Sequence, residues 1–263
     1  MSQRTIKRIA LITMVADHIG RYIPGMPIWL CYIGRISAPL FFFCCAWGFQ
    51  YTSDKKKYLL RLYLLNLGMS MVNCALFVLS GTKDIDYYPS NQIFGTLFIG
   101  ALICYMWEKK KYGMLILFAV YQVALMWPLD WIDSLTSYYW YPAERSILGS
   151  ILGFALLAEG GVVFVCLFCL IYLFKENKMA LSAVYFLMTF IIYKGTHRVW
   201  SVSLLRFVFL DLWDLQHIMI LALPIMLMYN GEKGKGSKYF YYVFYPVHVW
   251  VLFVIEMMFL NKG

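Results

Sequence analysis

Long apolar runs alternate with short polar and basic segments along the whole chain. A helix of about 20 residues crosses the hydrocarbon core of a bilayer, and most of these runs have about that length. The runs are continuous, whereas the strands of a membrane barrel alternate between apolar and polar positions. The pattern predicts an all-α, polytopic integral membrane protein with about 9–10 transmembrane helices. The predicted spans cover about residues 6–23, 28–51, 58–80, 91–107, 112–129, 146–174, 179–197, 214–229 and 239–260.

The predicted number of membrane crossings depends on how three segments of the chain are interpreted. The run 146–174 is broken by Glu159-Gly160-Gly161, so it is either one long tilted or kinked helix or a re-entrant pair. Residues 199–210 are apolar except for Arg206, which fits a re-entrant or interfacial helix. Residues 130–145 form a polar, aromatic loop of the kind that lies at the headgroup level. No soluble segment, linker or repeat interrupts the chain, so we expect a single membrane domain over residues 1–263.

Basic residues gather in the short segments between the runs. When 146–174 counts as one crossing, these segments fall on one side of the membrane, which the positive-inside rule makes cytoplasmic. The acidic and aromatic loops at 82–90 and 130–145 then lie outside, which gives nine crossings and a cytoplasmic N-terminus. The basic segments are Lys7/Arg8, Lys55–Lys57, Lys109–Lys111, Lys175/Lys178 and Lys233–Lys238.

The composition agrees with this class of protein. Hydrophobic residues make up 62% and charged residues only 14% of the chain, against about 25% charged residues in soluble domains. The net charge of +9 follows from the cytoplasmic loops, so no nucleic-acid partner is expected. The first apolar run lacks a small-residue cleavage site, which argues against a cleavable signal peptide. All seven cysteines lie in apolar runs and no metal-ligand spacing occurs, so neither a disulfide framework nor a metal is predicted.

An aspartate and a histidine stand side by side in the first predicted span. If the span enters the membrane near Ile9, His18 lies about 14 Å further along the helix axis, close to the bilayer centre. Ionisable groups are costly there and are usually functional. Asp17 and Arg21 are four residues apart and share a helix face. This arrangement could keep an aspartate ionised beside a histidine that acts as a general base.

Other ionisable residues are expected at a similar depth. His248 lies ten residues beyond Lys238 in the last span, so it could share a site with His18 or only donate an interhelical hydrogen bond. Arg35 lies roughly 10 Å deep in the second span at the helical rise. Glu159 either belongs to the site or only marks a helix break, and Asp17 with Arg21 could be a structural ion pair. These residues fit proton-coupled transport and group transfer equally well.

Short motifs along nearly the whole chain resemble the TraX family of bacterial inner-membrane proteins, whose founding member is implicated in N-acetylation of conjugative pilin. The middle of the chain, from about residue 112 to 228, matches the family poorly, so no functional residue is assigned there from the resemblance. The motifs are Ile6–Leu11 with Met14 and Asp17-His18-Ile19, Gly34–Phe41 with Trp47-Gly48, Asn91–Phe94, Tyr229-Asn230-Gly231 with Lys235-Gly236, and Phe244–His248. Lys7 and His18 also resemble the Arg-x10-His pattern of transmembrane acyltransferases, although lysine is not equivalent to arginine as a phosphate ligand.

The resemblance implies a multi-pass acetyl- or acyltransferase of the bacterial cytoplasmic membrane. Cytosolic acetyl-CoA would bind through Lys7, Arg8 and Lys235, and its acetyl group would pass to an amine or hydroxyl of an envelope peptide, glycan or lipid. His18, oriented by Asp17, would be the general base, while Arg35 or His248 would stabilise the oxyanion. The expected substrate-binding residues are Arg21, Asn91, Glu159 and Tyr245. The competing hypotheses are a proton-coupled transporter and a non-catalytic envelope assembly protein.

Overall fold

The structure is a computed structural model, and it describes every residue except 82–87, 90–92, 129–140, 199–213, 235–238 and 261–263. Within the described residues the regular structure is helical, without strands. The chain forms two compact units, which are taken separately below. The first contains Met1–Tyr51 and Leu170–Gly263, and the second contains Thr52–Cys169.

Three helices of the described chain are long and apolar enough to cross a membrane: Trp29–Gln50, Lys55–Ser80 and Phe240–Phe259. Shorter apolar helices accompany them. The prediction of an all-α membrane protein is therefore confirmed. The helices over predicted spans 6–23 and 179–197 carry charges at their ends and do not belong to this group, so the number of crossings and the cytoplasmic N-terminus stay predictions.

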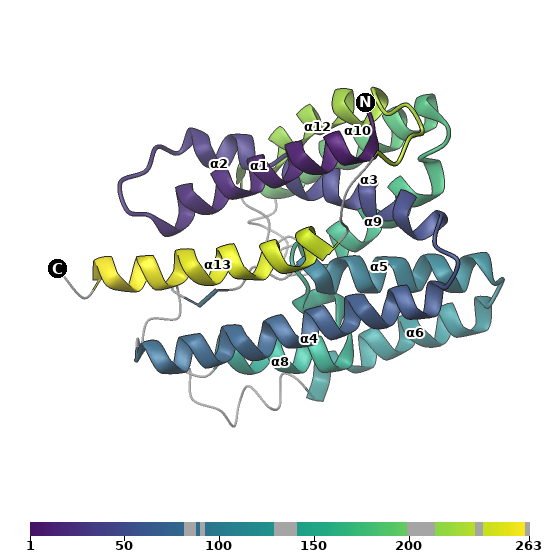
Figure 1. The fold of residues 1–263 in the computed structure, drawn as a ribbon. Helices are drawn as coiled ribbons and strands as arrows, with labels where there is room; N and C mark the ends of the chain where they lie inside the picture. Colours follow the sequence, from purple (N-terminus) through teal and green to yellow (C-terminus); the bar gives the residue numbers. More distant parts are fainter. Residues whose placement is uncertain (82–87, 90–92, 129–140, 199–213, 235–238, 261–263) are drawn as a thin grey trace. The chain divides into compact units, whose positions relative to one another are not determined.

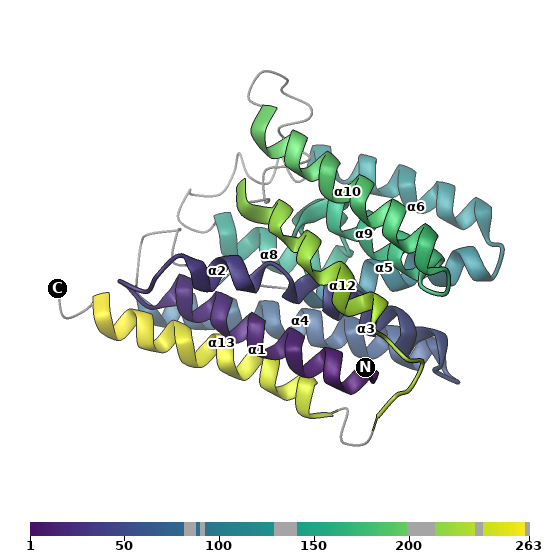
Figure 2. The same cartoon turned by 90° about the horizontal axis from the view of Figure 1, so that it is seen from above.

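In the first unit, helix α1 (Gln3–Tyr22) runs between α2 and α13, as Figure 2 shows. Ser2 caps its start by accepting a hydrogen bond from the backbone N–H of Thr5 at 3.3 Å. The next two helices, α2 (Trp29–Gly34) and α3 (Ser37–Gln50), both pack on α1. The span predicted over 28–51 agrees with the membrane-spanning segment Trp29–Gln50, which has a break at Arg35-Ile36, where α2 ends and α3 begins.

A glycine allows α2 to lie directly on α1. A Cβ atom at Gly34 would stand 2.2 Å from the Cβ of Asp17, which is closer than two side-chain carbons can approach. Gly20 on α1 is similarly tight, because its Cβ would lie 2.9 Å from the Sγ of Cys31 on α2. The two helices therefore meet through small residues, as is common between membrane helices.

The remaining helices of the first unit come from the C-terminal third of the chain. These are α10 (Lys178–Arg198), the 3₁₀ segment η4 (Asp214–Leu221), α12 (Ala222–Leu227) and α13 (Tyr239–Leu260). The hydroxyl of Tyr185 on α10 donates to the carbonyl of Met219 at 2.6 Å and joins α10 to η4. Only the second half of the predicted span 214–229 is α-helical, and the interpretation of 199–210 falls outside the described residues.

The second unit contains α4 (Lys55–Ser80), α5 (Ile93–Glu108), α6 (Tyr112–Ala124), α8 (Tyr141–Leu152), η2 (Ala155–Leu157) and the first part of α9 (Gly161–Phe174). Helix α4 packs against α5 and α8 (Figure 1). Asp54 caps α4, and Gly81 ends it in the left-handed conformation. Helix α6 has no buried residue, and its exposed aliphatic side chains, such as Ile116 and Leu117, suit a lipid bilayer.

The long run 146–174 is interrupted rather than one continuous helix. Helix α8 ends at Leu152, a 3₁₀ turn follows, and α9 starts only at Gly161. Gly153, Gly160 and Gly161 all adopt positive φ values, which other residues reach only at a cost. Because α8 already begins at Tyr141, the prediction of a loop over 130–145 is wrong for its last five residues.

Candidate functional site

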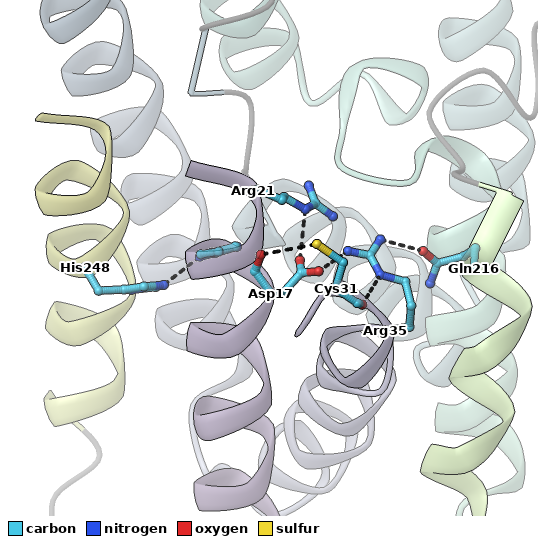
Figure 3. A network of polar contacts seen from close by, with 7 residues as sticks. Asp17, Arg21, Cys31, Arg35, Gln216 and His248 are labelled. Carbon is cyan, nitrogen blue, oxygen red and sulfur yellow. Dashed lines mark hydrogen bonds and ion pairs between the residues drawn. The ribbon is translucent and has the colours of Figure 1, made fainter. Parts of the chain in front are cut away.

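Asp17 and His18 leave α1 in different directions. Successive residues of an α-helix are about 100° apart around the axis, so neighbours in sequence face different partners. Figure 3 shows Asp17 directed towards Arg35. His18, by contrast, forms its hydrogen bond with His248 on α13. Both side chains are buried, with exposed fractions of 7% for Asp17 and 4% for His18.

The Asp17 carboxylate lies between two arginines. Its Oδ2 lies 3.1 Å from Nε of Arg21, one turn further along α1, as the spacing of four residues predicts. Its Oδ1 accepts a hydrogen bond from Nη2 of Arg35, which follows α2. Two cations facing one carboxylate offset the cost of burying it within an apolar protein. The three side chains together carry one more positive than negative charge.

Arg35 joins three segments of the first unit. Besides its bond to Asp17 on α1, its Nε donates to the carbonyl of Cys31 at 3.1 Å. Its Nη1 donates to Oε1 of Gln216 in η4 at 3.2 Å, and Gln216 is itself only 4% exposed. The thiol of Cys31 in turn donates weakly to the carbonyl of Asp17 over 3.8 Å. The guanidinium therefore fixes α1, the end of α2 and η4 in one arrangement (Figure 3).

His18 and His248 form a histidine pair. Nδ1 of His18 lies 2.7 Å from Nε2 of His248, and the two ring planes differ by only 9°. Nδ1 of His248 lies 2.9 Å from the carbonyl oxygen of Phe244, one turn earlier on α13. Tyr245 packs edge-on against both imidazoles, with ring centroids 6.4 Å from His18 and 5.7 Å from His248. The structure thus brings three predicted site residues together from opposite ends of the chain.

These contacts change the partner assigned to His18. The sequence analysis expects Asp17 to orient it, whereas the Asp17 carboxylate binds Arg21 and Arg35. The Nδ1 atom of His18 bonds to His248 instead.

Two of the predicted coenzyme ligands, Lys7 and Arg8, lie near the start of α1. The ammonium group of Lys7 stands 5.7 Å from the ring centroid of Tyr241 on α13, within the range of a cation–π contact. Arg8 is exposed. Lys235 and Asn91 lie outside the described residues. Glu159 belongs to the second unit, where its backbone carbonyl accepts a hydrogen bond from Thr96 at 2.6 Å. Among the described residues, no group of three or more His, Cys, Asp or Glu side chains could hold a metal ion.

Two buried polar residues were not anticipated. Gln216 stands next to Arg35, but it lies in the part of the chain where no motif matches, so the sequence carries no signal for it. Glu256 is 8% exposed on α13, and its Oε2 has no hydrogen-bond partner in the described part of the structure. A signal for Glu256 exists, since it is a single carboxylate within the apolar run 239–260.

Comparison with known proteins agrees with the motifs. A model of the TraX family, described as TraX protein, matches residues 2–256. No curated protein and no solved structure matches the chain. The matched residues include both histidines of the pair as well as Asp17 and its two arginine partners. The chain belongs to the TraX family of membrane proteins.

Proposed function

We propose that the protein is an acyltransferase of the bacterial cytoplasmic membrane. It moves an acetyl or other acyl group from a cytosolic acyl-CoA to an amine or hydroxyl of an envelope acceptor. The observation that carries this proposal is a buried imidazole, His18, bonded through Nδ1 to a second histidine. Membership in the TraX family, which is associated with conjugative pili and pilin, supports it.

His18 acts as the general base. Imidazole accepts a proton near neutral pH, and a hydrogen bond to one ring nitrogen orients the other towards the substrate. The acceptor then attacks the thioester carbonyl, and the negative charge that develops on oxygen needs a donor or a cation. Both ring nitrogens of His248 already make hydrogen bonds. The nitrogens of Arg35 are bonded as well, to Asp17, Cys31 and Gln216, but its guanidinium carries a positive charge that attracts the developing oxyanion, so Arg35 is the better candidate of the two.

The start of α1 supplies the positive charge for the coenzyme phosphates. Lys7 and Arg8 lie in the first two turns of α1, and Lys235 belongs to the basic loop before α13. His18 is eleven residues beyond Lys7, which corresponds to about 16 Å along the helix axis. The pantetheine arm of acyl-CoA bridges this distance, so the phosphates stay at the surface while the thioester reaches His18. Arg21 and Tyr245 remain the proposed contacts for the acceptor.

The test combines binding and turnover in purified protein. Thermal unfolding is measured with increasing acetyl-CoA or free CoA, and transfer is followed by the release of the CoA thiol in the presence of candidate acceptors. The wild type is compared with His18→Ala and Lys7→Ala. The matched control is His217→Ala, which removes a histidine packed against Tyr193.

A ligand that binds the folded state raises the unfolding temperature, because it adds a stabilisation of RT ln(1 + [L]/Kd), which grows with the logarithm of its concentration above Kd. We expect this shift in the wild type, His18→Ala and His217→Ala, and its loss in Lys7→Ala. Transfer should fall by roughly 10²–10⁴-fold in His18→Ala, which is the range for a general base, and persist in His217→Ala. Full transfer by His18→Ala would refute the mechanism. No thermal shift at millimolar ligand, together with flux that depends on a pH gradient, would identify a proton-coupled transporter instead.

A further inference from the structure

The hydrogen bonds of His248 define where the protons of the histidine pair reside. A backbone carbonyl oxygen can only accept, so the 2.9 Å contact with Phe244 requires that Nδ1 of His248 carries a hydrogen. A neutral imidazole has one donor and one acceptor nitrogen. Nε2 of His248 is then the acceptor, and the 2.7 Å contact requires Nδ1 of His18 to be the donor. The lone pair of neutral His18 therefore resides on Nε2.

The opposite arrangement needs an additional buried charge. If Nε2 of His248 donated to His18, His248 would carry hydrogens on both nitrogens and would be a cation. Asp17, Arg21 and Arg35 already contribute one excess positive charge next to His18. A further unpaired cation in an apolar environment is strongly unfavourable. The neutral pair, with the hydrogen on Nδ1 of both rings, is the arrangement consistent with these contacts.

We propose that His248 is a positioning residue that holds His18 in its Nδ1–H tautomer and so makes Nε2 the catalytic base. The role of Nε2 as a base rests on the proposed function, whereas the tautomer of His18 follows from the hydrogen bonds alone. Phe244 and His248 are four residues apart, so the imidazole of His248 lies next to the backbone carbonyl of the preceding turn. This spacing makes the hydrogen bond that fixes the tautomer of His248 possible. Tyr245 packs against both rings and restricts their rotation.

The proton balance of the transfer follows from this assignment. The acceptor N–H or O–H gives its proton to Nε2 of His18 while its lone pair forms the new bond to the thioester carbon. The C–S bond then breaks, and its electron pair leaves on sulfur. The proton on Nε2 passes to that sulfur, which yields free CoA and returns His18 to its starting tautomer. The Nδ1–H of His18 stays bonded to His248 throughout and stabilises the transient imidazolium.

The first experiment reads the tautomer directly and needs no substrate. The protein contains four histidines, so ¹⁵N-histidine labelling of the ligand-free protein in detergent gives a small set of imidazole signals. Comparison with His18→Ala assigns the pair. We expect His18 as the Nδ1–H tautomer in the wild type. We expect the same in His248→Gln, whose amide oxygen can accept at the place of Nε2. His248→Leu, which offers no acceptor, should lose this preference.

An Nε2–H tautomer at His18 in the wild type would overturn the proposal, as would an unchanged tautomer in His248→Leu. If His248→Leu does not fold, the wild type and His248→Gln still decide the question. These outcomes do not depend on whether the protein transfers acyl groups.

The second experiment measures turnover in the same variants. We expect His248→Leu to lower kcat by roughly 10²-fold or more at an unchanged KM for acyl-CoA, and His248→Gln to retain most of kcat. A merely structural role would reduce both variants alike, which would overturn the proposal, as would full activity of His248→Leu. If the wild type shows no transfer with any acyl-CoA, the proposed function fails, while the tautomer measurement still tests the arrangement of the pair.

Discussion

Replacing Gly34 by alanine should disrupt the contact that holds the charged side chains together. The new methyl group would stand 2.2 Å from the Cβ of Asp17, whereas ordinary contacts begin at 3.4 Å. The Cβ of Asp17 is fixed to the backbone of α1, so no side-chain rotation can relieve the overlap. Helix α2 has to move away from α1, and Arg35, the next residue, moves with it away from the Asp17 carboxylate.

The expected cost has two parts. Forcing an extra methyl group into a packed contact typically costs about 1–3 kcal/mol. Weakening the Asp17–Arg35 pair adds a fraction of the roughly 3–5 kcal/mol that is lost when a buried pair is broken, because Asp17 keeps Arg21. A chain of this size shifts its unfolding temperature by about 2–4 °C per kcal/mol. Gly34→Ala should therefore lower the unfolding temperature by roughly 4–15 °C.

Gly68 provides the control for this substitution. It lies inside α4, and a Cβ there would meet nothing within 4 Å. Gly68→Ala should raise the free energy of unfolding slightly, by up to about 1 kcal/mol, because alanine is the better helix former. The assay is thermal unfolding of both purified variants in the same detergent, followed by circular dichroism. Equal unfolding temperatures for the two variants would refute the close approach of α1 and α2.

Two further predictions concern charge. Arg35→Met should destabilise the protein by about 3 kcal/mol or more, because it removes one partner of a buried pair. The double variant Asp17→Asn/Arg35→Met should lose less than the sum of the single losses, and additive losses in denaturant unfolding would show that the pair is not coupled. Asp54 caps α4, and the backbone N–H of Lys57 holds the pKa of its carboxyl below the ordinary value. Its contribution is therefore complete above the unfolded pKa near 4 and is lost as pH falls through the lower folded pKa. Asp54→Asn should remove this pH dependence in the acid range, and an identical acid profile for both proteins would contradict it.

The sequence predicts the helices well where runs are apolar and bounded by basic residues. Helices α4, α5, α10 and α13 begin and end within a few residues of the expected spans. Breaks within an apolar run are harder to predict, because hydropathy does not distinguish a continuous helix from two helices joined by an irregular turn. Arg35-Ile36 and the η4 segment are such cases, and both lie where a polar contact to Arg35 is made. Long-range hydrogen bonds such as the one between Arg35 and Gln216 leave no periodic signal in the sequence.

The candidate site, too, is predicted from the sequence only in part. The pair Asp17 and Arg21 follows from helical spacing, and the similar depth of His18 and His248 places both in one layer of the predicted membrane. The direction of each side chain does not follow, because it depends on which helices pack on each face of α1. Because residue 34 is glycine, α2 can pack closely on one face of α1, and this packing brings Arg35 next to Asp17. The sequence therefore predicts that His18 and His248 lie at a similar depth, but not that His18 bonds to His248 while Asp17 bonds to arginines.

The two adjacent residues of the first motif consequently have separable roles. Asp17 connects α1 to Arg35 and thereby to η4, so its loss weakens the packing of three segments. His18 contacts α13 through one hydrogen bond to His248, and its loss removes the proposed base and one such bond. A single neutral hydrogen bond contributes only about 1 kcal/mol to stability, whereas an unbalanced buried charge costs several times more. Substitution at residue 17 should therefore act mainly on stability and substitution at residue 18 mainly on turnover. If the two positions instead gave the same ratio of lost stability to lost activity, the proposed division between a residue that acts mainly on stability and one that acts mainly on turnover would not hold.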